Sequence, residues 1–198
     1  MSSFDDRAAT WDDPAKIERA AEVARAIGET IPLDPATRLL EYGAGTGLVT
    51  QALRARVGPV TLADTSAGMR AVMAEKVARG VIPDARIWDV DLAAAEPPDE
   101  QFDLIVTVLT LHHIPDLDPV LGAFAALLAA GGRVAIVDLD AEDGSFHGHD
   151  FEGHPGFERA WLTARLEAAG FTDVAFRPCF VVERGNGTYP MFLATARA

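Results

Sequence analysis

The stretch LLEYGAGTGLVT, residues 39–50, carries three glycines in the spacing G-x-G-x-G and is the clearest indication of the fold. The apolar residues before the glycines are typical of a buried strand, and those after them begin a helical pattern. Because glycine has no Cβ, Gly43, Gly45 and Gly47 let the backbone take unusual torsions and approach a ligand closely. In open parallel sheets, nucleotides bind at such turns between a strand and the next helix. The stretch therefore predicts a nucleotide pocket.

Strand and helix patterns alternate along the chain on both sides of this turn. Apolar runs predict strands at 37–42, 60–63, 85–90, 102–109 and 133–139. Apolar spacing predicts helices at 13–28, 48–55, 66–77, 118–130 and 157–168, with Asp13 and Ser66 as caps and Gly28 and Gly131-Gly132 as stops. Parallel neighbours need a crossover connection, and helices supply it. The order predicts an α/β fold with a doubly wound, mostly parallel sheet and helices on both faces.

The end of the chain follows a different pattern. Strands are expected at 174–182 and 190–196, joined by ERGNGT, whose glycines and asparagine suit a hairpin. We therefore expect an antiparallel strand pair at one edge of the sheet. The 198 residues fit one domain over 1–198, with an N-terminal helical cap at 1–30 and a core at 36–198.

Composition restricts the partners. Thirty acidic and 17 basic side chains leave a net charge of -13, which repels phosphate backbones and anionic lipid, so we expect neither nucleic acid nor a membrane as partner. The single cysteine, Cys179, cannot form an intramolecular disulfide. Charged residues at the start and short apolar runs argue against a secretory signal or a membrane span. These features predict a cytoplasmic protein, monomeric or homodimeric.

Acidic residues mark the ends of the first three predicted strands. Glu41 precedes the glycine turn, Asp64 follows the second strand, and Asp91 follows the third, with Asp89 as a competing assignment. The third glycine comes one residue too early for the dinucleotide fingerprint G-x-G-x-x-G. The turn therefore does not match the usual pyrophosphate site.

Together these features resemble the first motif of the class I S-adenosylmethionine-dependent methyltransferases, an acid and a hydrophobe followed by G-x-G-x-G. Further stretches look like family motifs: TLADTSAGM at 61–69, Phe102-Asp103 eleven positions after Asp91, FDLIVTVLTLHHIPD at 102–116, and LLAAGGRVAIVDLD at 127–140. The C-terminal hairpin fits the family's reversed last strand. The resemblance thus covers most of the chain and implies a Rossmann-like sheet.

The resemblance implies S-adenosyl-L-methionine as cofactor and S-adenosyl-L-homocysteine as product. In the family the acid at the position of Asp64 accepts hydrogen bonds from the ribose hydroxyls, Met69 faces adenine, and Asp91 lies near adenine. The implied cofactor-binding residues are Glu41, Gly43, Ala44, Gly45, Asp64, Thr65, Met69, Asp91, Leu92 and Thr107. Acids suit this cofactor, because it is a cationic sulfonium with ribose hydroxyls to be bound.

Methyl transfer is an in-line displacement, so the protein aligns donor and acceptor and removes a proton where the acceptor carries one. His112 and His113 follow the fourth predicted strand, and His147 lies in FHGHDFEGHPGF, residues 146–157, after the fifth. We predict His113 and His147 as catalytic residues on the acceptor side. The alternative for His112 and His113 is that one of them satisfies a loop backbone group while the other packs near the cofactor.

The same loop offers donors for a metal ion. Three histidines with Asp150 and Glu152 supply suitable ligands, but their spacing is not a strong signature. A glycine-rich loop with two or three polar contacts over the pocket is the simpler account. The sequence therefore predicts no metal site.

The acceptor is expected to be a small molecule with an oxygen or nitrogen nucleophile. The segment after the fourth strand reads TLHHIPD rather than the N-P-P-Y type of enzymes that methylate macromolecular nitrogens. Phe4 and Trp11 are either an aromatic lid or an anchor for the first helix. Two rival functions remain: a non-catalytic sensor that binds the cofactor or its product, and a nicotinamide-dependent oxidoreductase, which needs the missing G-x-G-x-x-G.

Overall fold

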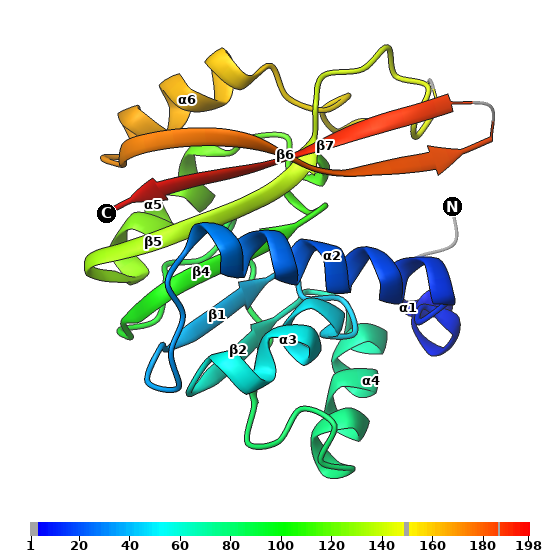
Figure 1. The fold of residues 1–198 in the computed structure, drawn as a ribbon, viewed down its shortest axis with the longest axis vertical. Coiled ribbons are helices and arrows are strands. Elements are labelled where there is room, and N and C mark those ends of the chain that lie inside the picture. The colour runs from blue at the N-terminus through cyan, green and yellow to red at the C-terminus, as the bar shows by residue number, and fades with distance from the viewer. Residues whose placement is uncertain (1–3, 149–150, 186) are drawn as a thin grey trace. The chain divides into compact units, whose positions relative to one another are not determined.

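The computed structural model describes residues 4–148, 151–185 and 187–198 and divides into two compact units, residues 1–91 and 92–198 (Figure 1). The first unit has three parallel strands, β1 (Leu39–Tyr42), β2 (Val60–Ala63) and β3 (Arg86–Trp88), in the order β3-β2-β1. Its helices are α1 (Phe4–Arg7), η1 (Ala8–Thr10), α2 (Pro14–Thr30), α3 (Leu48–Leu53), η2 (Arg54–Arg56) and α4 (Ala67–Ala78). Tyr42 pairs with Ala63, and Ala63 with Trp88, so the three strands end at one edge.

Local capping explains where two of these helices begin. The Asp13 carboxylate accepts the backbone N–H of Lys16 at 2.8 Å, and Pro14 starts α2. The Ser66 hydroxyl accepts the N–H of Met69 at 3.2 Å at the start of α4. Side-chain oxygens at these positions satisfy N–H groups that lack partners within the helix. Both predicted caps are confirmed.

The predicted stop at Gly28 is wrong, because α2 continues to Thr30. The Arg56 guanidinium donates to the Gly28 carbonyl at 2.8 Å, and it lies where a Cβ on Gly28 would stand. Gly28 therefore makes room for a tertiary contact rather than ending the helix.

The second unit begins with a parallel pair and ends with an antiparallel one. Its strands are β4 (Phe102–Val108), β5 (Leu128–Leu139), β6 (Thr172–Arg184) and β7 (Gly187–Arg197), in the order β4-β5-β7-β6. Its helices are η3 (Leu111–His113), α5 (Asp118–Leu127) and α6 (Arg159–Ala168). β4 and β5 run parallel, while β7 is antiparallel to both β5 and β6. The predicted C-terminal antiparallel pair is confirmed.

The predicted end of α5 at Gly131-Gly132 is wrong, because the helix ends at Leu127 and β5 begins at the next residue. Phe102 in β4 pairs with Leu128 in β5, but Leu104 pairs with Arg133, so β5 has extra residues at this point. Gly131 is one of them and has a left-handed backbone, with φ +77°. Glycine tolerates this conformation, so the strand absorbs a bulge that the apolar pattern does not show.

The last six residues of β5, Val134 to Leu139, are all buried, as in a strand covered on both faces. Asp138 is the charged member of this run and has no exposed surface. A search of the described residues finds no helix long and apolar enough to cross a membrane.

Candidate functional site

The glycine turn follows β1 and consists of left-handed glycines. Gly43, Gly45 and Gly47 have φ values of +68°, +58° and +78°. A Cβ on Gly47 would stand 2.8 Å from the Cδ1 atom of Ile82, so side-chain packing also excludes a larger residue there. The Ala44 N–H donates to the Ala63 carbonyl at 2.9 Å, which ties the turn to the end of β2.

Asp64, directly after β2, holds the turn in place. Its Oδ2 atom accepts the Gly45 N–H at 2.7 Å, and its Oδ1 atom accepts the Ser66 N–H at 2.8 Å. Burial raises the pKa of the Asp64 carboxyl, while the two backbone hydrogen bonds act in the opposite direction. The structure thus brings together Gly45 and Asp64, two residues predicted from separate motifs.

Glu41 points into the first unit rather than out of it. Glu41 is only 3% exposed, and its Oε2 atom accepts the Thr50 N–H in α3 at 2.9 Å. The pKa of Glu41 is raised to about 7, mainly by burial; the Asp64 charge acts in the same direction, and the Thr50 hydrogen bond and the Lys76 charge oppose it. Glu41 therefore fixes the helix that follows the turn, and a direct contact with a cofactor stays a prediction.

The N-terminal segment lies against the turn. The Trp11 indole nitrogen lies beside Gly45, 3.7 Å from the place where a Cβ on that glycine would stand. The rings of Phe4 and Trp11 pack edge to face, with their centroids 5.8 Å apart. Asp12 accepts the Thr46 hydroxyl and pairs with Lys76 Nζ at 2.7 Å. These contacts place Trp11 where a lid over a ligand at the turn would lie.

Asp5 makes a second attachment of this segment. Its Oδ1 atom accepts the Ser66 hydroxyl at 2.6 Å and the Gly68 N–H at 2.8 Å. The Ser66 hydrogen bond is the main cause of the lowered pKa of Asp5. The segment thus contacts both the glycine turn and the start of α4.

The other predicted cofactor residues of the first unit differ in exposure. Thr65 and Asp91 are exposed, while Met69 is buried in the core. Asp89, the competing assignment, forms an ion pair with Arg70 at 2.7 Å. The ion pair gives Asp89 a structural role that needs no ligand.

Two predicted cofactor residues belong to the second unit. Leu92 and Thr107 are each 1% exposed. Among the described residues, the Thr107 hydroxyl is a buried group without a hydrogen-bond partner. Buried hydroxyls are normally satisfied, so Thr107 is the more informative of the two.

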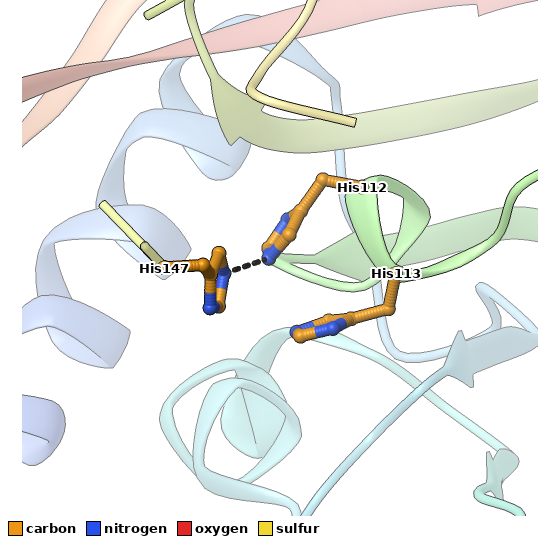
Figure 2. A group of neighbouring side chains, drawn as sticks. All are labelled: His112, His113 and His147. Atoms are coloured by element: carbon orange, nitrogen blue, oxygen red, sulfur yellow. Dashed lines mark hydrogen bonds between the residues drawn. The ribbon is translucent and has the colours of Figure 1, made fainter. Parts of the chain in front are cut away.

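The second unit also holds three histidines, His112, His113 and His147, which we call the histidine cluster (Figure 2). Two come from η3 after β4, and the third comes from the loop after β5. His112 Nδ1 lies 2.6 Å from Asp138 Oδ1, and His112 Nε2 lies 3.0 Å from His147 Nε2. The His113 ring lies 4.2 Å from that of His112 between centroids. Figure 2 shows the three rings turned toward one another.

Burial controls the charge of two of these rings. It lowers the pKa of His113 to about 4 and that of His147 to about 4, and the charge of His112 acts in the same direction. Desolvation disfavours the charged imidazolium, so both rings are neutral near pH 7. His147 also stacks on Phe151, with centroids 4.0 Å apart.

A cavity of about 590 Å³ lies beside His147. Its polar lining includes Ser145, Arg184 and Tyr189, and the Ser145 and Tyr189 hydroxyls are 3.0 Å apart. The cavity therefore offers hydroxyl groups and one fixed positive charge next to a neutral histidine.

Sequence analysis missed the pairing of His112 with Asp138, which is the most buried part of the cluster. The available signal was the acid in AIVDLD at the carboxyl end of a strand, the same criterion that selected Asp64. His154 lies outside the cluster, and its Nε2 atom is 3.1 Å from the Ile114 carbonyl oxygen. His149 and Asp150 lie outside the described residues, and Glu152 is exposed.

A family model described as "Methyltransferase domain" matches residues 15–175. An uncharacterized methyltransferase of Schizosaccharomyces pombe is 32% identical over 118 residues, which are 56% of this chain and 42% of that protein. The bifunctional biotin biosynthesis protein BioCD of Bordetella avium is 35% identical over 144 residues, 70% of this chain and 30% of that protein. The chain spans about half the length of the first curated relatives it matches.

Solved structures show the same fold over nearly all of the chain. An S-adenosylmethionine-dependent methyltransferase from Aquifex aeolicus has a TM-score of 0.73 at 21% identity, covering 98% of this chain and 97% of its own. The N-methyltransferase NodS from Bradyrhizobium japonicum, in complex with S-adenosyl-L-homocysteine, has a TM-score of 0.71 at 20% identity, with 94% and 88% covered.

The glycine turn with its acid and the structural similarity define the Rossmann-like class, which confirms the predicted fold class. Within that class the chain belongs to the methyltransferase family, whose model covers most of its length. The family match confirms the predicted methyltransferase class. The Aquifex aeolicus enzyme and NodS, which share the fold, are described with S-adenosylmethionine or its product, in keeping with the predicted cofactor.

The raised pKa of Glu41 predicts a pH-dependent stability. Between its ordinary value of 4.5 and about 7, the folded chain keeps a proton that the unfolded chain has lost. Folding stability therefore falls as pH rises through this window, by about 3 kcal/mol in total for this group. Glu41→Gln keeps an oxygen for the Thr50 N–H and removes this contribution. Urea unfolding of both proteins at pH 5 and pH 8 measures it, and an equal pH dependence in the two would contradict the assignment.

Asp64→Ala is expected to weaken S-adenosylmethionine binding by about 2 kcal/mol, roughly 30-fold, because hydrogen bonds to a charged group contribute on that order. Calorimetric titration of the full chain measures the change. Asp64→Asn retains an oxygen for Gly45 and separates loss of charge from loss of the turn contact. The exposed Asp34→Asn serves as control and should bind like the parent chain. Unchanged affinity in Asp64→Ala would remove Asp64 from the cofactor site.

Proposed function

We propose that this chain transfers a methyl group from S-adenosylmethionine to a small molecule that presents an oxygen or nitrogen nucleophile. The observation that carries the proposal is the Asp64 carboxylate held against a left-handed glycine turn in a chain of the methyltransferase family. The names of two relatives support a small acceptor: BioCD is a biotin biosynthesis protein, and UbiE of Xanthomonas oryzae is a ubiquinone/menaquinone biosynthesis C-methyltransferase. UbiE methylates carbon, so its name supports the size of the acceptor and not the oxygen or nitrogen nucleophile.

The residues at the turn suit the cofactor chemically. A carboxylate has about four lone-pair sites, and the N–H groups of Gly45 and Ser66 occupy two at Asp64. The remaining sites can accept ribose hydroxyls. Gly43 and Gly45 have no side chain to keep a ligand from the backbone. When bound, S-adenosylmethionine supplies a methyl group on a cationic sulfur.

The chain's own residues then have three tasks. The glycine turn and Asp64 bind and orient the cofactor, with Met69, Asp91, Leu92 and Thr107 as further proposed contacts. Trp11, whose indole nitrogen lies beside Gly45, would cover a ligand bound at the turn. On the acceptor side we assign His113 and His147, whose ring nitrogens lie in one cluster with His112. Both rings are neutral near pH 7, and the lowered pKa that keeps them neutral also makes them weak bases.

The proposal can be tested in two linked assays on the full chain. Calorimetry with S-adenosylmethionine, S-adenosylhomocysteine and NADH should show binding of the two sulfur nucleosides and none of NADH. Incubation with methyl-labelled S-adenosylmethionine and a panel of phenols, carboxylic acids and amines should then give a labelled product. Binding without any product across the panel favours a sensor, and binding of NADH alone contradicts the family's cofactor for this chain.

The acceptor-side assignment has its own test. His147→Ala is expected to lower kcat for the labelled product by about 100-fold, in the range typical of general-base groups, with S-adenosylmethionine affinity unchanged. His154→Gln, outside the cluster, is the matched control and should keep the parent kcat. An unchanged kcat in His147→Ala would exclude His147 from the reaction.

A further inference from the structure

The histidine cluster has the geometry of a metal-binding group. One ring nitrogen from each of His112, His113 and His147 lies within 4.8 Å of the others. Nitrogens that bind one tetrahedral ion at 2.0–2.1 Å stand ~3.3 Å apart, so small ring movements bring all three to bonding distance. His112 Nε2 and His147 Nε2, already 3.0 Å apart, need the least adjustment.

Asp138 prepares His112 for coordination. Because a carboxylate accepts hydrogen bonds, the 2.6 Å contact places the His112 proton on Nδ1 and leaves the Nε2 lone pair facing His147. Asp138 is itself fixed, since its carboxylate accepts the N–H groups of His112 at 3.3 Å and Leu139 at 2.8 Å. A carboxylate that holds the far nitrogen of a histidine is the usual support of a metal-binding imidazole.

The surroundings leave room for a further ligand. His147 lines the cavity of about 590 Å³, where Arg184, Ser145 and Tyr189 also lie. Metal sites that take part in reactions commonly have three protein ligands and one open position. Of the cluster, His147 lines this cavity, and the positive charge and two hydroxyls beside it suit an anionic or hydroxyl-bearing small molecule.

We propose that His112, His113 and His147 bind one divalent transition-metal ion of the zinc type, with Asp138 orienting His112. Three imidazoles favour zinc over magnesium or calcium, which prefer oxygen ligands. Metal binding at these nitrogens goes beyond the proposed function: with the ion bound, His113 and His147 act as its ligands, and in the metal-free chain they can accept a proton. The rival arrangement is a metal-free chain of hydrogen bonds from Asp138 through His112 to His147.

The test uses the full chain, freed of metal with a chelator and titrated with Zn²⁺ by calorimetry, with Mg²⁺ in a parallel titration. We expect one Zn²⁺ per chain, no comparable Mg²⁺ binding, and the visible spectrum of a tetrahedral site when Co²⁺ replaces Zn²⁺. Asp138→Asn should weaken Zn²⁺ binding by 10- to 100-fold, the range typical of such supporting groups. His113→Ala and His147→Ala should each weaken it further.

Variants separate the cluster from other histidines. His154→Gln should bind Zn²⁺ like the parent chain, and circular dichroism without metal shows that each variant folds. Binding lost in His147→Ala but unchanged in His113→Ala would exclude His113 as a ligand and overturn the three-histidine site. Absence of Zn²⁺ binding by the folded parent chain would overturn it as well. Neither result depends on methyl transfer, so the metal site and the proposed function can fail separately.

Discussion

The hydrogen bond from Gly45 N–H to Asp64 is the contact on which the first unit's candidate site depends. A carboxylate taken out of water is costly unless hydrogen bonds replace its solvation, and here two backbone N–H groups do so. The Gly45 N–H reaches Asp64 within a turn whose glycines have left-handed torsions. The same bond links the ends of β1 and β2, and Trp11 and Asp12 pack against the turn it fixes.

In the second unit, hydrogen bonds likewise stabilise the carboxylate of Asp138. This acid sits at the carboxyl end of β5, fully buried, and is satisfied by His112 and two backbone N–H groups. Both units thus place an acid at or directly after the carboxyl end of a strand, half-buried at Asp64 and fully buried at Asp138, and backbone N–H groups donate to both carboxylates. The difference lies in the partner: Asp64 holds a backbone turn, whereas Asp138 orients a side chain whose other nitrogen faces the histidine cluster.

Features set by neighbouring residues could be predicted from the sequence, and features set by tertiary contacts could not. The side chains of Asp13 and Ser66 each accept the backbone N–H three residues ahead, so these caps follow from the local sequence. The sequence around Gly28 predicts a helix end, but in the folded chain the guanidinium of Arg56, which is distant in sequence, packs against Gly28 and donates to its carbonyl. His112 and Asp138 are 26 positions apart, so only the folded chain shows that they meet. His113 and His147 were found because both follow strands at the carboxyl edge.

The histidine cluster is poorly explained by stability alone. Replacing both partners of a buried hydrogen bond with apolar residues of similar size can be neutral or stabilising, and the residues before Asp138 in β5 are already apolar and buried. Leucine or phenylalanine at 112 and 138 would satisfy such a core without a hydrogen-bond network. The network instead fixes one nitrogen of His112 and leaves the other directed at His147, which borders a cavity. An arrangement that orients a lone pair toward two further imidazoles is useful for chemistry at those nitrogens, and packing gives no reason for it.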